Sequence, residues 1–118
     1  MTRQCLDRGI TVRRHSGRVR VRFAGRTIVD TDAALALAEG DHPIVYYVPR
    51  EAVDADILVH SAHTSTCPFK GHASYHHLRK GEDLIENAAW FYSDPCPELE
   101  AIRDHVAFRG IDVQVEAD

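Results

Sequence analysis

The chain has 118 residues, of which 44% are apolar and 27% charged, and it carries a net charge of −4. A chain of this size can bury one hydrophobic core, and this balance of apolar and charged residues excludes a disordered polypeptide. The longest apolar runs, 33–38 and 44–48, are far shorter than the roughly 20 residues of a membrane helix. The polar N-terminus also lacks the apolar stretch of a signal peptide, so we expect a cytoplasmic protein without membrane contact.

The first 16 residues show no sustained periodicity and are predicted to form an arm, laid over the domain or loose in solution. A single domain is expected over residues 17–118. At its start, residues 18–23 alternate strictly between arginine and apolar residues. This period of two predicts a strand with one buried face and one arginine-lined face.

The other strands are predicted from β-branched and aromatic runs between glycine, proline and aspartate. They cover residues 26–30, 33–38, 44–48, 56–60, 73–78, 88–92 and 111–115. Residues 61–71 are predicted to be a polar loop, and one helix is predicted to begin at Pro95 or Pro97, with glutamates in its first turn. The expected fold is mainly β: antiparallel meanders with one C-terminal helix.

Cysteine and arginine usage exclude several classes of protein. The three cysteines, Cys5, Cys67 and Cys96, contain no C-x-x-C pair, so we expect reduced thiols rather than a disulfide framework or a zinc knuckle. Eight arginines crowd the first 26 residues and could attract an anion. No helix-turn-helix, zinc-finger or RNA-stacking signature accompanies them, so nucleic-acid binding is not expected.

The segment 64–71 holds the most unusual chemistry, because a thiol, an ammonium and three hydroxyls lie within eight residues. Cys67 could be a nucleophile whose thiolate Lys70 or a nearby histidine stabilises, or it could be a small buried side chain. All other basic residues except Lys80 are arginines, so a lysine here favours a role for a compact ammonium in ligand contact.

Aromatic residues surround this segment in the sequence, and each could line either the core or a pocket. They are Tyr46, Tyr47, Phe69, Tyr75, Trp90, Phe91 and Tyr92. Since neighbours in a strand point to opposite faces, one of Tyr46 and Tyr47 should face the core. The histidines between positions 60 and 77 complete no metal-ligand spacing, so no metal is expected.

Four segments together resemble the bacterial family called domain of unknown function 427. They are YYVPREAV at 46–53, TCPFKGHASY at 66–75, AAWFYSDP at 88–95 and VAF at 106–108, and the resemblance covers residues 18–116. The characteristic positions of the family fall on Tyr47, Pro49, Arg50, Thr66, Cys67, Lys70, Tyr75, Trp90 and Tyr92.

The resemblance implies a compact β fold similar to the β-tent domains. Relatives of that fold often bind zinc through paired C-x-x-C knuckles, which this chain lacks, so packing alone would have to hold the tent together. The family has also carried a nucleotidyltransferase label. That activity needs a Gly-Ser phosphate-gripping turn, which is missing from this sequence, so the label is not supported.

We therefore predict a binding module without a cofactor, in which aromatic side chains and two cations hold a small polar or anionic ligand. The predicted ligand-binding residues are Tyr47, Arg50, Thr66, Lys70, Tyr75, Trp90 and Tyr92. The alternatives are a thiol enzyme, with Cys67 as nucleophile and Lys70 as activator, and a protein-interaction module. A homodimer is one option for the oligomeric state.

Overall fold

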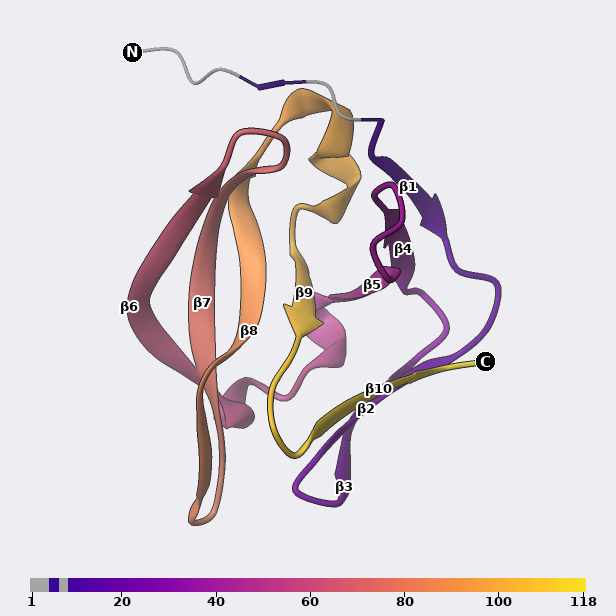
Figure 1. Cartoon of the computed structure of the whole chain (residues 1–118). Helices are drawn as coiled ribbons and strands as arrows, with labels where there is room; N and C mark the ends of the chain where they lie inside the picture. The colour runs from indigo at the N-terminus through magenta and orange to yellow at the C-terminus, as the bar shows by residue number, and fades with distance from the viewer. Residues whose placement is uncertain (1–4, 7–8) are drawn as a thin grey trace.

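The computed structural model describes residues 5–6 and 9–118, in which antiparallel strands dominate (Figure 1). The strands are β1 Thr11–Arg14, β2 Val19–Phe23, β3 Arg26–Thr31, β4 Leu35–Ala38, β5 Val45–Pro49, β6 Leu58–Cys67, β7 Gly71–Lys80, β8 Asp83–Pro95, β9 His105–Phe108 and β10 Val113–Ala117. Three short 3-10 helices complete the described part: η1 Arg50–Ala52, η2 Ala55–Ile57 and η3 Pro97–Ile102.

The strands form two sheets that enclose the core. The larger sheet has the order β1-β4-β5-β9-β8-β7-β6, and the smaller has the order β10-β2-β3. In Figure 1 the long strands β6, β7 and β8 lie on one side, β1 and β4 on the other, and β5 and β9 between them. The expected class, a mainly β domain with antiparallel sheets, is confirmed.

Two clusters of buried side chains hold the sheets together. The alternation seen in residues 18–23 is confirmed, because Val19, Val21 and Phe23 are at most 1% exposed and join the first cluster with Val48 and Val106. The second cluster contains Tyr47 and Tyr92, two of the predicted ligand-binding residues. Its buried members are Leu37, Tyr47, Ala73, Tyr92, Leu99, Ile102 and Ala107.

Strand β6 corrects the prediction of a polar loop at 61–71. After a register shift between His60 and Thr64, residues 64–67 pair with β7 as far as Cys67 opposite Gly71, and only residues 68–70 turn the chain. The sequence pattern is polar because half of the side chains of this edge strand are exposed, while the backbone hydrogen bonds to β7 stabilise it.

The predicted C-terminal helix is a 3-10 helix of six residues, η3. It does start at the predicted place, since Pro97 lies in its first turn and Cys96 is its N-cap. Leu99, however, has non-helical torsions (φ −113°, ψ 22°) that interrupt the turn. Burial of Leu99 and Ile102 in the second cluster accounts for this short, kinked form better than helix propensity does.

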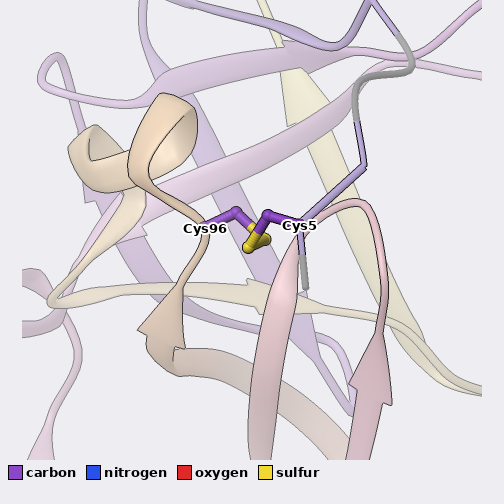
Figure 2. The surroundings of a disulfide bond; sticks show 2 residues. All are labelled: Cys5 and Cys96. Carbon is purple, nitrogen blue, oxygen red and sulfur yellow. A yellow bond between two sulfur atoms is a disulfide. The ribbon is translucent and has the colours of Figure 1, made fainter. Parts of the chain in front are cut away.

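The predicted arm contains a strand and a disulfide, and both differ from the sequence-based expectation. β1 pairs with β4 from Thr11 opposite Ala38 to Arg14 opposite Leu35. Cys5 is bonded to Cys96 at the start of η3, with 5.9 Å between the Cα atoms (Figure 2). The prediction of three reduced thiols is therefore wrong: an odd number of cysteines only required that one, Cys67, stay free. The rest of the predicted arm, 1–4 and 7–8, lies outside the described residues.

Candidate functional site

The tight turn at 68–70 between β6 and β7 carries Lys70. The Lys70 N–H donates to the carbonyl of Cys67 at 3.2 Å, and the Lys70 carbonyl accepts from the N–H of Cys96 at 2.8 Å. Gly71 follows with φ +122°, and a Cβ there would collide with the backbone of Asp94 and Pro95. Glycine is therefore required at this position, and the base of the lysine is held in place.

The ammonium of Lys70 pairs with a carboxylate that the sequence reading did not single out. Its Nζ lies 3.0 Å from Oε1 of Glu39, and the two side chains are 20% and 9% exposed. A carboxylate so well buried needs a nearby cation, because burial penalises an uncompensated charge. Glu39 thus fixes the direction of the lysine side chain.

Lys70 and Trp90 line one open hollow of about 360 Å³. Its walls are Ile44, Val45, Tyr46, Lys70, Trp90, Phe108, Arg109 and Val115. The guanidinium of Arg109 lies over the indole, 5.7 Å from the ring centroid, as a cation–π pair. The hollow therefore combines apolar and aromatic walls with two cations.

The predicted tyrosines gather behind Trp90 rather than in the hollow itself. The indole N–H of Trp90 donates to the hydroxyl of Tyr47 at 3.4 Å, and the ring of Tyr92 lies 6.5 Å from that of Tyr47. Tyr47 and Tyr92 are 1% and 7% exposed. Tyr75, directly across from Trp90 in the β7–β8 ladder, shares a hydrogen bond of 2.9 Å with Ser65. These rings form the backing of the indole.

Burial changes the acid–base behaviour of the two inner tyrosines. Desolvation raises the pKa of Tyr47 to about 12, and the hydrogen bond from Trp90 opposes this only in part. Desolvation likewise raises the pKa of Tyr92. Both hydroxyls are therefore neutral over the whole physiological range.

This shift makes Tyr47 a source of alkaline instability. Its pKa is about 12 in the fold and about 10 in the unfolded chain, so its contribution is intact below about pH 10 and falls as the pH rises toward 12. The expected loss is about 2–3 kcal/mol. Free energies of unfolding measured in urea between about pH 8 and 12, roughly the range of tyrosine titration, should fall less steeply for Tyr47→Phe than for the wild type. Tyr46→Phe is the matched control, and equal slopes for the two variants would contradict the assignment.

Two further predicted residues, Thr66 and Cys67, end strand β6. The hydroxyl of Thr66 is 3.0 Å from Nδ1 of His72 and is exposed, so it is already engaged away from the hollow. Cys67 is partly exposed and is the free cysteine. It lies two positions after Ser65 in β6, so its side chain leaves the sheet on the same face as Ser65, which bonds Tyr75.

Arg50, the second predicted cation, does not meet Lys70. It lines a different cavity, together with His76 and Phe91. Trp90 and Phe91 are consecutive in β8, so their side chains leave the sheet on opposite faces, and Arg50 belongs to the face of Phe91. The second cation on the walls of the hollow is Arg109.

Sequence reasoning missed Glu39 and Arg109, which together with Lys70 supply the charges around the hollow. Glu39 carried one weak signal, since it directly follows the apolar strand predicted at 33–38. Arg109 carried none, because an arginine just before Gly110 is typical of an exposed turn. Only the crossing of β9 beside β8 brings it over Trp90.

The sequence of this chain matches the model of a known protein family. The family model described as "Domain of unknown function (DUF427)" matches residues 11–118. The chain belongs to the DUF427 family. The match starts at β1, so this strand is part of the DUF427 region, and it includes the hollow and all predicted site residues. A search of the curated proteins found no match.

Two structural observations on this DUF427 chain concern metal ions and membranes. Within residues 5–6 and 9–118, no three histidine, cysteine or acidic side chains lie together in a way that could hold a metal ion. In the same part of the chain, every helix is too short or too polar to cross a bilayer.

Proposed function

We propose that this DUF427 domain binds a small monoanionic molecule with an aromatic or aliphatic body, in the hollow beside Trp90. The observation that carries the proposal is the position of two cations, Lys70 and Arg109, on the walls of a hollow whose other residues are mostly apolar or aromatic. Such a combination is typical of pockets in which a few polar groups orient an apolar ligand.

The charges favour a single negative charge on the ligand. Glu39 neutralises Lys70 at 3.0 Å, so Arg109 supplies the net positive charge of the hollow. An ammonium has three donors, and Glu39 needs only one of them, so Lys70 can still donate to a ligand carboxylate. A carboxylate fits this arrangement better than a dianion, which Glu39 would repel.

Exposed apolar side chains at the hollow favour an apolar ligand body. Ile44 and Val115 are 42% and 38% exposed, high values for large aliphatic residues, and both lie on its walls. Covering them with a hydrocarbon or aromatic ring removes apolar surface from water, which is favourable at about 25 cal/mol per Å². The indole of Trp90 offers a flat contact for such a ring.

The fluorescence of Trp90, the single tryptophan, can test this proposal directly. We expect phenylacetate to change the emission in a saturable way, and uncharged 2-phenylethanol to bind about tenfold more weakly, because it lacks the charge-assisted hydrogen bonds. Arg109→Met should weaken phenylacetate binding about five- to tenfold. Arg22→Met, at an exposed arginine of strand β2, is the matched control and should leave binding unchanged.

Three outcomes would overturn the proposal. Equal affinity for phenylacetate and 2-phenylethanol would remove the anionic part. An equal effect of the two arginine substitutions would remove the role of Arg109. Unchanged emission with both phenylacetate and hexanoate would show that the hollow holds no carboxylate of this class.

Cellular location and assembly stay proposals from the sequence. A bacterial cytoplasm was expected, whereas the Cys5–Cys96 disulfide favours a more oxidising setting, because cytosolic thiols are kept reduced. The homodimer also stays a prediction.

A further inference from the structure

Two adjoining cavities lie on the face of the large sheet opposite to the Trp90 hollow, since Phe91 follows Trp90 in β8. The smaller, of about 120 Å³, is lined by Arg50, His76, Phe91, Asp104, His105 and Val106. The larger, of about 420 Å³, is lined by Pro49, Arg50, Glu51, Asp104 and His105. Three residues are shared, so the cavities form one site. None of its residues lines the Trp90 hollow, and the site is therefore independent of the proposed function.

Arg50 brings a cation to this site, and most of its side-chain donors are free. Its backbone N–H donates to the carbonyl of Asp104 at 2.8 Å, one step beyond the β5–β9 pair of Pro49 and His105. Its partly buried guanidinium makes one long hydrogen bond, of 3.4 Å, to the carbonyl of Val53. Among the described residues, no carboxylate forms an ion pair with it. The guanidinium has five donors in a planar fork that matches a carboxylate, so Arg50 offers an anchor for one.

Asp104 holds a carboxylate beside this cation without neutralising it. Its backbone has φ +63°, in the left-handed region that suits aspartate and asparagine better than most other residues. Two hydrogen bonds support this turn: its carbonyl accepts from Arg50, and Nδ1 of His105 donates to the carbonyl of Arg103 at 2.9 Å. The side chain of Asp104 is exposed, and so is that of Glu51 at the larger cavity. A ligand there can meet a cation and a carboxylate at the same time.

The smaller cavity adds apolar walls next to these charges. The ring of His76 stacks on that of Phe91, with centroids 5.2 Å apart and planes at 22°. The side chain of Val106 is 1% exposed and lies on the same cavity. The volume of about 120 Å³ suits a short aliphatic side chain, and burying such a chain against these walls is favourable.

We propose that the two cavities together bind a free α-amino acid with a short aliphatic side chain, whose carboxylate pairs with Arg50 and whose ammonium pairs with Asp104. The side chain packs on Phe91 and Val106 in the smaller cavity. The charges disfavour other classes of ligand. A dianion such as phosphate would be repelled by the carboxylates of Glu51 and Asp104, and a simple amine would leave Arg50 without a partner.

Three compounds that share an isopropyl group test the two charged contacts by NMR of the backbone amides in the full chain. We expect L-valine to shift the amides of Arg50, Asp104 and His105 in a saturable way. Isobutylamine, which lacks the carboxylate, should bind about tenfold more weakly. Isovalerate, which lacks the ammonium, should bind about three- to fivefold more weakly, because an ion pair with the exposed Asp104 is screened by water.

Substitutions of the two charged residues should separate these contacts. Arg50→Gln should weaken L-valine binding about tenfold, and Asp104→Asn about three- to fivefold. Asparagine also tolerates the left-handed backbone, so this change removes the charge and keeps the turn. In Asp104→Asn, L-valine and isovalerate should bind with the same affinity. Asp112→Asn is the matched control, because Asp112 is exposed with φ +60° and lines neither cavity. Thermal unfolding shows whether each variant is folded, and Arg109→Met should leave L-valine binding unchanged.

Four results would overturn the assignment. Amides that do not shift with L-valine up to about 50 mM, beyond the millimolar range of weak ligands, would exclude this class of ligand. Equal affinity of the wild type for L-valine and isovalerate would remove the ammonium contact. A folded Arg50→Gln variant with unchanged affinity would remove the carboxylate contact. An equal effect of Asp104→Asn and Asp112→Asn would remove the role of Asp104.

Discussion

Replacing Cys5 with alanine should lower the free energy of unfolding by about 2–4 kcal/mol, because the lost disulfide closes a long loop in the unfolded chain. The bonded cysteines lie 91 positions apart, so the cross-link removes much of the conformational freedom of the denatured state. Cys5 is the better partner to replace, since Cys96 is fully buried and its substitution would also disturb the core. Urea unfolding, with and without reductant, measures the effect.

The control for this experiment is Cys67→Ala, which removes the free thiol and leaves the disulfide in place. This variant and the wild type should both lose stability in reductant, while Cys5→Ala should be insensitive to it. Three titratable thiols in the unfolded wild-type protein without reductant, together with a midpoint that does not respond to reductant, would contradict the disulfide.

Lys70→Met should destabilise the domain by about 2–4 kcal/mol, because it leaves the carboxylate of Glu39 without its cation. The pair is 20% and 9% exposed, so water compensates the loss of the ammonium only in part. The double variant Glu39→Gln/Lys70→Met removes both charges and should recover most of the loss. Free energies of unfolding for the wild type, the two single variants and the double variant complete a double-mutant cycle.

Lys80→Met is the matched control for the loss of a lysine, since Lys80 is exposed near the tip of the β7–β8 hairpin and should cost less than about 0.5 kcal/mol. If Lys70→Met lowers the free energy of unfolding as little as Lys80→Met does, the ion pair between Lys70 and Glu39 does not stabilise the fold. If the double variant is as unstable as the Lys70 single variant, the cost comes from packing of the lysine stem rather than from charge.

The sequence predicts the strands best where burial alternates along them. In β2 the apolar residues Val19 and Val21 alone decide which face is buried, so a period of two is enough. The same period of two is absent from β6. Its edge position leaves polar side chains in solvent, and the strand depends on pairing with β7. Prediction from the sequence also fails for β1, because only contact with β4 distinguishes these four residues from a coil.

The candidate site is predictable in part for a similar reason. The segment at 66–75 pointed to Lys70, and the tryptophan that lines the same hollow came from a separate segment of the family resemblance. The charge that orients the lysine, Glu39, and the cation over the indole, Arg109, directly follow β4 and β9, whose neighbours are set by the sheet order. Spacing along a chain carries no information about such pairings.

The turn that bears Lys70 is tied to the beginning of the chain. The N–H of Leu6 donates to the carbonyl of Pro68 at 2.8 Å, next to the disulfide of Cys5, while Cys96 binds the Lys70 carbonyl from the other side. Removing the first six residues would cut two of these three ties. Protein prepared in this way should then report on a loosened lysine rather than on the native hollow.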